Sequence, residues 1–167
     1  VLSRMRGIDG LFGAVVVSTC NRVEFYASSV CPLRAMEGLR QFLIERTGIN
    51  NLPFYSHDSL PGVRHLFRVA SGLDSMVIGE TEILGQVKQA YNAAAEHGAT
   101  NAYLNKLFQH AFRVAKQVRT ETRITRGSTS VGSVAVELAG KIFGDLRGRK
   151  VMLLGAGETS ERVARSL

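Results

Sequence analysis

A thiol and a guanidinium lie two residues apart in the stretch STCNRVEFYA, which begins at Ser18. Cys20 would be a good nucleophile as its thiolate, a form that a cation such as Arg22 or a protonated His65 favours when it lies close enough in the fold. The competing interpretation makes Cys20 a small buried hydrophobe at a strand end, a common fate of a free cysteine. Arg22 is likewise either an ordinary surface residue or a fork for a carboxylate. The residues alone favour neither interpretation of Cys20.

Polar side chains also gather in and after the glycine-bounded segment GLDSMVIGE, residues 72–80. They are Asp74, Ser75, Glu80, Glu82 and Gln86. Acidic residues near the start of a helix are favoured by the helix macrodipole, which alone would explain the glutamates. His65 precedes this segment on the apolar face of a predicted helix, where a histidine more often belongs to the core than to a catalytic site. A chemical role for these residues therefore needs further support.

The elements that would position these side chains are those of an α/β fold. The β-branched run 14–19 and the run 23–28, where apolar residues alternate with Glu24 and Tyr26, predict two strands joined by the loop TCNR. The segment 60–62, Leu-Pro-Gly, predicts a turn. Apolar residues at helical spacing predict helices over about 33–47, 63–71, 82–96, 104–123 and 130–143.

A charged, glycine-punctuated turn, GDLRGRK at residues 144–150, marks the predicted domain boundary. We expect an α/β domain over residues 1–148 and the start of a second domain over residues 149–167. The chain starts at Val1 without an initiator methionine and stops at Leu167 within a predicted helix, so we expect it to be truncated.

The second unit opens with a nucleotide-binding pattern. An apolar strand is predicted over 151–154, and the turn GAGETS follows it into helix-forming residues. Gly155 and Gly157 would allow the tight turn and the close approach of a pyrophosphate, while Ser160 takes the third small position. This pattern predicts a Rossmann-type start. It does not separate NAD from NADP, because the discriminating residue lies past the end of the chain.

Composition adds an anionic partner to these expectations. Lys and Arg number 21 against 14 Asp and Glu, giving a net charge of +7, which favours a partner such as nucleic acid. The predicted helix 104–123 has a basic side with Lys116, Arg119 and Arg123, either a phosphate contact or a solvated face.

The sequence also limits the class of protein. No apolar run approaches the roughly 18 residues of a membrane span. Two cysteines are too few for a disulfide framework, so a cytoplasmic setting is expected. The four histidines and two cysteines show no ligand spacing, so we expect no metal site.

Several motifs together resemble the glutamyl-tRNA reductase family in order from about Ala14 to Leu167. They are STCNRVEFYA, HLFRVASGLDSMVIGETEILGQVKQAY, FQHAFRVAKQVRTETRI, GSTSVGSVAVELA and VMLLGAGE. The resemblance implies NADPH-dependent reduction of glutamyl-tRNA(Glu) to glutamate-1-semialdehyde through a cysteine thioester. This reaction is the first step of the five-carbon route to tetrapyrroles.

Carried over residue by residue, the resemblance makes Cys20 the nucleophile and His65 the activity-linked histidine. The implied substrate contacts are Thr19, Asn21, Arg22, Ser75, Glu80, Thr81, Glu82 and Gln86. The implied NADPH contacts are Gly155, Ala156, Gly157, Glu158, Thr159 and Ser160. It further implies a homodimer formed through a C-terminal helical domain absent from this chain, and a handover of the aldehyde to an aminomutase.

Charge gives these contacts a physical purpose. We hypothesise that Arg22 forks the side-chain carboxylate of the substrate and that Glu80 or Glu82 attracts its α-ammonium group. His65 would orient the ester or act as a general acid. Two residues depart from the usual family pattern. Ser160 replaces the usual small third residue of the glycine turn, and Glu82 stands where relatives often carry glutamine.

Two other functions stay open at this point. One is an NADP-dependent dehydrogenase of a free small metabolite, which would need no tRNA. The other is a non-catalytic tRNA-binding module, in which the alkylation of Cys20 would be no faster than that of an ordinary thiol.

Overall fold

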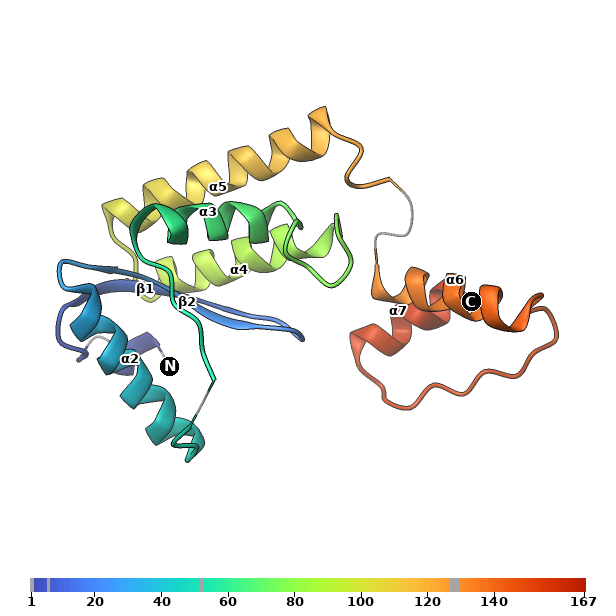
Figure 1. The fold of residues 1–167 in the computed structure, drawn as a ribbon, viewed down its shortest axis with the longest axis horizontal. Coiled ribbons are helices and arrows are strands. Elements are labelled where there is room, and N and C mark those ends of the chain that lie inside the picture. Colours follow the sequence, from blue (N-terminus) through green and yellow to red (C-terminus); the bar gives the residue numbers. More distant parts are fainter. Residues whose placement is uncertain (1, 6, 52, 127–129) are drawn as a thin grey trace.

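The computed structural model describes residues 2–5, 7–51, 53–126 and 130–167. It confirms a mixed α/β fold in which one two-stranded sheet is covered by helices (Figure 1). The elements are α1 (Leu2–Met5), β1 (Leu11–Ser18), β2 (Val23–Ser29), α2 (Pro32–Thr47), α3 (Ser59–Ala70), α4 (Glu82–Glu96), α5 (Ala102–Glu121), α6 (Val131–Phe143) and α7 (Glu158–Ser166). No helix in these ranges is long and apolar enough to cross a membrane.

The sheet is an antiparallel hairpin whose buried face carries an acid. Val17 pairs with Glu24 across the hairpin, and the side chains of such partners lie on the same face. Val17 is fully buried and Glu24 is 8% exposed, whereas Val23 is 60% exposed. The alternation predicted for β2 is present, but its polar side is the one that faces the core. The register with β1 decides this, because β1 is the more apolar strand.

Helices α3, α4 and α5 cover one side of the hairpin, while α2 lies on the other side (Figure 1). The core joins Val15 of β1, Leu66 of α3, Val87 of α4 and Phe108 of α5, all of them buried. Tyr26 of β2 reaches the same core and meets the Phe108 ring edge-on, with centroids 5.7 Å apart. The helices therefore fix the position of β2 and of the loop before it.

The predicted helices are confirmed, with one clear correction. Helix α3 begins at Ser59, so the segment 60–62 predicted as a turn is helical. Proline is tolerated there because the first-turn N–H groups have no intrahelical partner. The predicted ends of the other helices lie within two residues of those observed. Gly48 adopts the expected left-handed cap at φ 71°, and Ser130 caps α6 through a capping box with Ser133.

The segment between α3 and α4, residues 71–81, closes on itself through two glycines with positive φ. Gly72 has φ 76° and Gly79 has φ 83°, and the Gly79 N–H donates to the Gly72 carbonyl at 2.9 Å. A Cβ added to Gly79 would clash with the carbonyl oxygen of Ile124. This segment, called the 71–81 loop below, therefore packs against the chain that leaves α5.

Replacing Gly79 with alanine is expected to destabilise the fold by more than about 2 kcal/mol, because both backbone conformation and space exclude a side chain. Gly85 in α4 is the matched control, since a Cβ there meets nothing within 4 Å. Gly85→Ala is expected to be neutral or to stabilise by roughly 0.5–1 kcal/mol through helix propensity. Urea unfolding of the two variants checks both signs, and equal stabilities would contradict the packing described here.

Helices α6 and α7 pack against each other, apart from the hairpin (Figure 1). The strand predicted over 151–154 is wrong for this chain: the segment is irregular and its side chains are largely exposed, Leu154 at 84%. A strand needs a neighbour for its backbone groups, and within the described ranges only β1 and β2 pair. The glycine turn and the helix that follows it are confirmed as α7.

Candidate active site

The loop TCNR is a tight connection whose shape comes from Thr19. The Thr19 Oγ1 atom accepts the N–H groups of Asn21 and Arg22, each at 3.2 Å. The Thr19 N–H donates to the Arg22 carbonyl at 2.9 Å. Cys20, at the outside of this turn, is a free and exposed cysteine. The interpretation of Cys20 as a buried hydrophobe is therefore wrong, and its thiol is open to a substrate.

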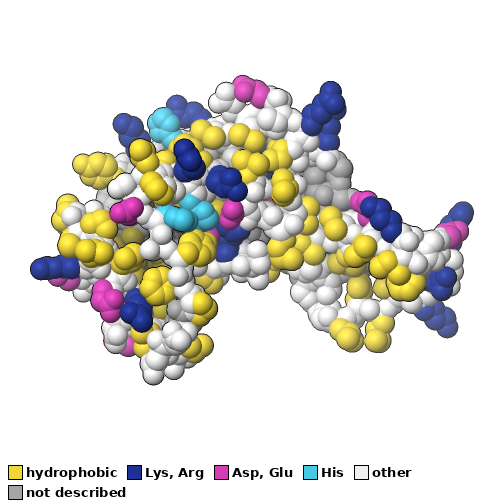
Figure 2. All heavy atoms as spheres, in the orientation of Figure 1, with side chains coloured by type: hydrophobic (Ala, Val, Ile, Leu, Met, Phe, Trp, Pro, Cys, Tyr) yellow, Lys and Arg dark blue, Asp and Glu magenta, His cyan; other side chains and the backbone are white. Residues whose placement is uncertain are grey.

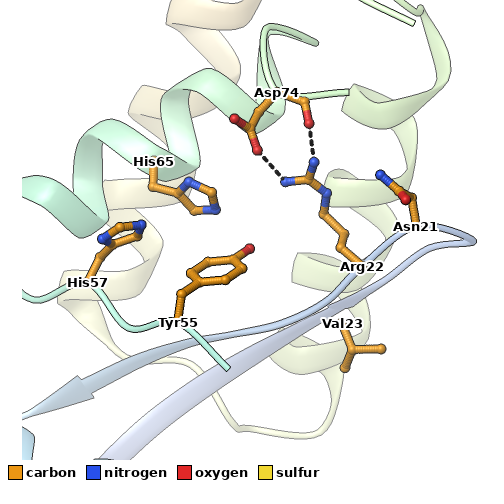
Figure 3. Close-up of a pocket in the computed structure, with 7 residues that line it drawn as sticks. All are labelled: Asn21, Arg22, Val23, Tyr55, His57, His65 and Asp74. Carbon is orange, nitrogen blue, oxygen red and sulfur yellow. Dashed lines mark hydrogen bonds and ion pairs between the residues drawn. The ribbon is translucent and has the colours of Figure 1, made fainter. Parts of the chain in front are cut away.

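Arg22 turns back into the molecule and is already paired with two carboxylates. Its Nη1 lies 3.0 Å from Glu24 Oε1 and 3.0 Å from Asp74 Oδ2, and its Nη2 donates to the Asp74 carbonyl (Figure 3). Burial alone would lower the pKa of Arg22, but hydrogen bonds and charges of Asp74 and Glu24 outweigh it and raise that pKa. Arg22 is thus a fixed cation whose terminal nitrogens are engaged within the chain.

Glu24 is the centre of the hydrogen-bond network around Arg22 and was not among the site residues predicted from the sequence. Its carboxylate accepts from Tyr26 Oη at 2.5 Å, from Tyr55 Oη, from His65 Nε2 at 2.9 Å and from Arg22. Burial raises the pKa of Glu24, but the bonds from the tyrosines and His65 outweigh it and hold that pKa below its usual range. The side chain is therefore an ionised carboxylate that is only 7% exposed.

The ionised state of Glu24 fixes how His65 can act. A carboxylate only accepts hydrogen bonds, so the proton on the shared bond belongs to His65 Nε2. Nδ1 is then the nitrogen with a lone pair in the neutral ring, as in other carboxylate–histidine pairs. His65 is consequently an oriented histidine and not simply a core residue, since it also borders a surface hollow.

That hollow has a volume of about 430 Å³ and opens beside the hairpin. Figure 2 shows histidine side chains on this face with basic and acidic side chains close around them. The lining residues come from the hairpin, the connection before α3, α3 itself and the 71–81 loop (Figure 3): Asn21, Arg22, Val23, Tyr55, His57, His65 and Asp74.

Tyr55 and His57 were missed by the sequence analysis because they stand in an irregular segment with no motif. Their rings pack around His65, with centroids 5.5 Å and 5.1 Å from it respectively. Burial and the charge of Glu24 raise the pKa of Tyr55 to about 12, so its hydroxyl stays a donor at neutral pH.

The other predicted substrate residues lie on the 71–81 loop and α4. Ser75 follows Asp74 directly, Glu82 opens α4, and Gln86 lies one turn further along that helix. The carbonyls of Glu80 and Thr81 each accept from Arg119 Nη2 at 3.1 Å. The Arg22–Asp74 pair joins the hairpin to the 71–81 loop. Of the predicted residues, Asn21, Arg22, His65 and Asp74 line the hollow. Those that do not line it are Thr19, Cys20, Ser75, Glu80, Thr81, Glu82 and Gln86.

Arg119 does not point outward as a basic stripe would require. Its Nη2 donates to the carbonyls of Glu80 and Thr81. Burial lowers the pKa of Arg119. Lys116 and Arg123 are exposed, Arg123 just beyond the end of α5, and their contact with an anionic partner stays a prediction.

The proposed cofactor segment has the geometry of an anion-binding helix start. Gly155 has φ 118°, and α7 begins after Gly157 without a side-chain cap on its first N–H groups. Such groups are well placed to bind a pyrophosphate. The side chain of Glu158 lies outside the described residues. Among the residues that are described, no three His, Cys, Asp or Glu side chains gather as a metal site.

Comparison with known proteins identifies the family. Residues 1–122 match the family model for the N-terminal domain of glutamyl-tRNAGlu reductase. The glutamyl-tRNA reductase of Akkermansia muciniphila is 53% identical over 167 residues, covering 98% of this chain and 49% of that protein. The enzyme of Syntrophus aciditrophicus is 49% identical, covering 99% and 41% respectively.

A solved structure agrees with these sequence matches. The glutamyl-tRNA reductase of Methanopyrus kandleri matches with a TM-score of 0.64 and 42% identity, over 99% of this chain and 40% of its own. The chain thus spans about half or less of the length of these relatives. With the family model covering most of its length, this chain belongs to the glutamyl-tRNA reductase family.

Proposed function

We propose that the whole protein is an NADPH-dependent oxidoreductase that converts glutamyl-tRNA(Glu) into glutamate-1-semialdehyde, opening the five-carbon route to tetrapyrroles. The observation that carries this proposal is the exposed Cys20 on a turn whose neighbour Arg22 lines one hollow with His65. An exposed thiol two residues before a fixed cation, which itself lines a hollow with an oriented histidine, suits acyl transfer from an ester. Membership of the family supplies the substrate class.

The first step forms a thioester on Cys20. The thiolate attacks the glutamyl carbonyl, the bond from that carbonyl to the ribose oxygen breaks, and the ribose oxygen leaves with a proton. His65 is the proposed proton donor or orienting group, because Glu24 holds its Nε2 at 2.9 Å and leaves Nδ1 for the substrate. As a donor, Nδ1 would first take up the proton that the Cys20 thiol loses on forming the thiolate and would then pass it to the ribose oxygen. The thiol is a better leaving group than the ribose hydroxyl, so the thioester is the more easily reduced species.

The second step needs NADPH, which when bound supplies a hydride to the thioester carbonyl and so releases the aldehyde and the thiolate. The residues that would hold its pyrophosphate are those of the glycine turn and the first turn of α7, Gly155, Ala156, Gly157, Thr159 and Ser160. Glu158 belongs to the same proposal by its place in the sequence.

Further parts of the proposal concern the whole protein. They are a cytoplasmic homodimer, a handover of the aldehyde to an aminomutase, and a division between a catalytic and a nucleotide-binding domain near residue 148. The packing of α6 on α7 favours a boundary before Val131 over the one predicted near residue 148.

The test is to look for the covalent intermediate in the full-length protein. Glutamyl-tRNA labelled in its glutamate is added without NADPH, the mixture is quenched in acid, and peptides are analysed by mass spectrometry. We expect label on Cys20 that hydroxylamine removes. Bound tRNA without an adduct would support the non-catalytic binding module instead. Equal reactivity toward a simple glutamate ester would support a dehydrogenase of a small metabolite.

A further inference from the structure

Asp74 occupies the position on Arg22 that the proposed function gives to the substrate. Its Oδ2 lies 3.0 Å from Arg22 Nη1, and its carbonyl accepts from Arg22 Nη2 (Figure 3). Glu24 takes the remaining contact on Nη1 at 3.0 Å. A carboxylate that forks an arginine needs two of its nitrogens with their hydrogens free. A glutamyl carboxylate can therefore fork the two terminal nitrogens of Arg22 only if Asp74 withdraws.

A second arginine is placed to receive the withdrawn carboxylate. Asp74 Oδ1 lies 3.5 Å from Nη2 of Arg68, which projects from α3. The Arg22 side chain is 11% exposed and that of Arg68 is 53% exposed. Asp74 is thus shared between an inner and an outer cation. A small swing toward Arg68 would free Arg22 while Asp74 keeps an ion pair.

The backbone around Asp74 allows such a swing. Gly72, two residues before it, has φ 76° and Gly79 has φ 83°, and the Gly79 N–H closes the loop on the Gly72 carbonyl at 2.9 Å. The tip between these glycines is exposed at Leu73, Met76 and Ile78. The ends of the loop are therefore held while its tip has few packing contacts to break.

We propose, on the basis of the proposed function, that the Asp74 carboxylate occupies the place of the substrate carboxylate on Arg22. When a glutamyl side chain binds, Asp74 moves from Arg22 to Arg68 and leaves Arg22 to the substrate. The exchange replaces one carboxylate by another, so the buried Arg22 keeps its charge partner throughout. A neutral side chain such as that of glutamine would have to displace a carboxylate with an amide, which leaves Arg22 undercompensated. Asp74 thereby keeps weak and neutral ligands off the hollow.

The direction in which KM changes in one variant distinguishes this proposal from a merely supporting role of Asp74. Asp74→Asn keeps the shape and the hydrogen-bond acceptor but removes the charge that competes with substrate. In the full-length protein we expect the KM for glutamyl-tRNA to fall by about three- to tenfold. The KM for glutaminyl-tRNA is expected to fall by a similar factor. A rise in KM for glutamyl-tRNA would overturn the proposal, because it would show that Asp74 only props Arg22 in place.

A double-mutant cycle with Arg68 tests the receiving position independently. Arg68→Gln is expected to raise the KM by roughly two- to fivefold in the wild type and to change nothing in the Asp74→Asn background. Arg64→Gln is the matched control, because it removes an equal charge from an exposed position one turn earlier on α3. Additive effects of Asp74→Asn and Arg68→Gln would overturn the exchange. Absence of any wild-type thioester would overturn the proposed function as well, so the two failures are distinguishable.

Discussion

Replacing Cys20 with serine is expected to abolish the labelled adduct and to lower NADPH-dependent aldehyde formation by at least about a thousandfold. The substitution changes one exposed atom, and the turn is held by Thr19 and backbone groups, so the fold is expected to be unaffected. A serine hydroxyl is a far weaker nucleophile than a thiolate at neutral pH. Rapid-quench measurement of the adduct and steady-state aldehyde formation check the two effects separately.

Cys31→Ser provides the control for this result. Cys31 is the other free cysteine, partly buried and placed before α2. Its replacement is expected to leave both the adduct and the reduction close to the wild type. An adduct that survives Cys20→Ser but is lost in Cys31→Ser would move the nucleophile to Cys31 and contradict the site described above.

Replacing Glu24 with glutamine is expected to destabilise the protein by about 2–4 kcal/mol and to slow thioester formation by roughly ten- to a hundredfold. An amide supplies one acceptor where the carboxylate receives four groups, and it leaves Arg22 with a single carboxylate partner. His65 also loses the charge that orients its ring. Urea unfolding measures the first effect, and single-turnover adduct formation measures the second.

The pH dependence of that destabilisation has a definite sign. The folded pKa of Glu24 lies below its ordinary value of 4.5, because bonds to the carboxylate outweigh its burial. The advantage of the wild type over Glu24→Gln is therefore complete above the ordinary value and is lost as pH falls through the folded pKa. Unfolding curves from pH 7 down to about 3 check this. A difference that grows on acidification would contradict the assignment.

The sequence was sufficient for the helices but not for every strand. Periodicity and caps located α2, α4, α5 and α6, because a helix satisfies its own backbone and its signals are local. The apolar segment 151–154 carries an equally clear strand signal, yet it is irregular, since strand pairing depends on a neighbour. The boundary of α3 was misplaced because a proline in the first turn of a helix resembles one in a loop.

In the candidate site, too, features set by neighbouring residues could be predicted, whereas contacts between distant residues could not. The turn around Cys20 follows from adjacent residues, and its exposure agrees with a chemical role. Glu24 was passed over because nothing in the alternation of β2 says that its polar side faces the helices. Tyr55 and Asp74 reach Glu24 and Arg22 only through tertiary contacts over 31 and 52 positions respectively. The residue types at positions 55 and 74 do not indicate such contacts.

The hairpin that presents Cys20 also contains Glu24, four positions later on β2. Adding or removing one residue between them would turn Glu24 to the solvent side of the strand and bring a neighbour such as Val23 or Phe25 into its place. The proposed nucleophile Cys20 and Glu24, the hydrogen-bond partner of His65, are thus tied to one fixed chain length. In an engineered protein this stretch would therefore have to be transplanted whole.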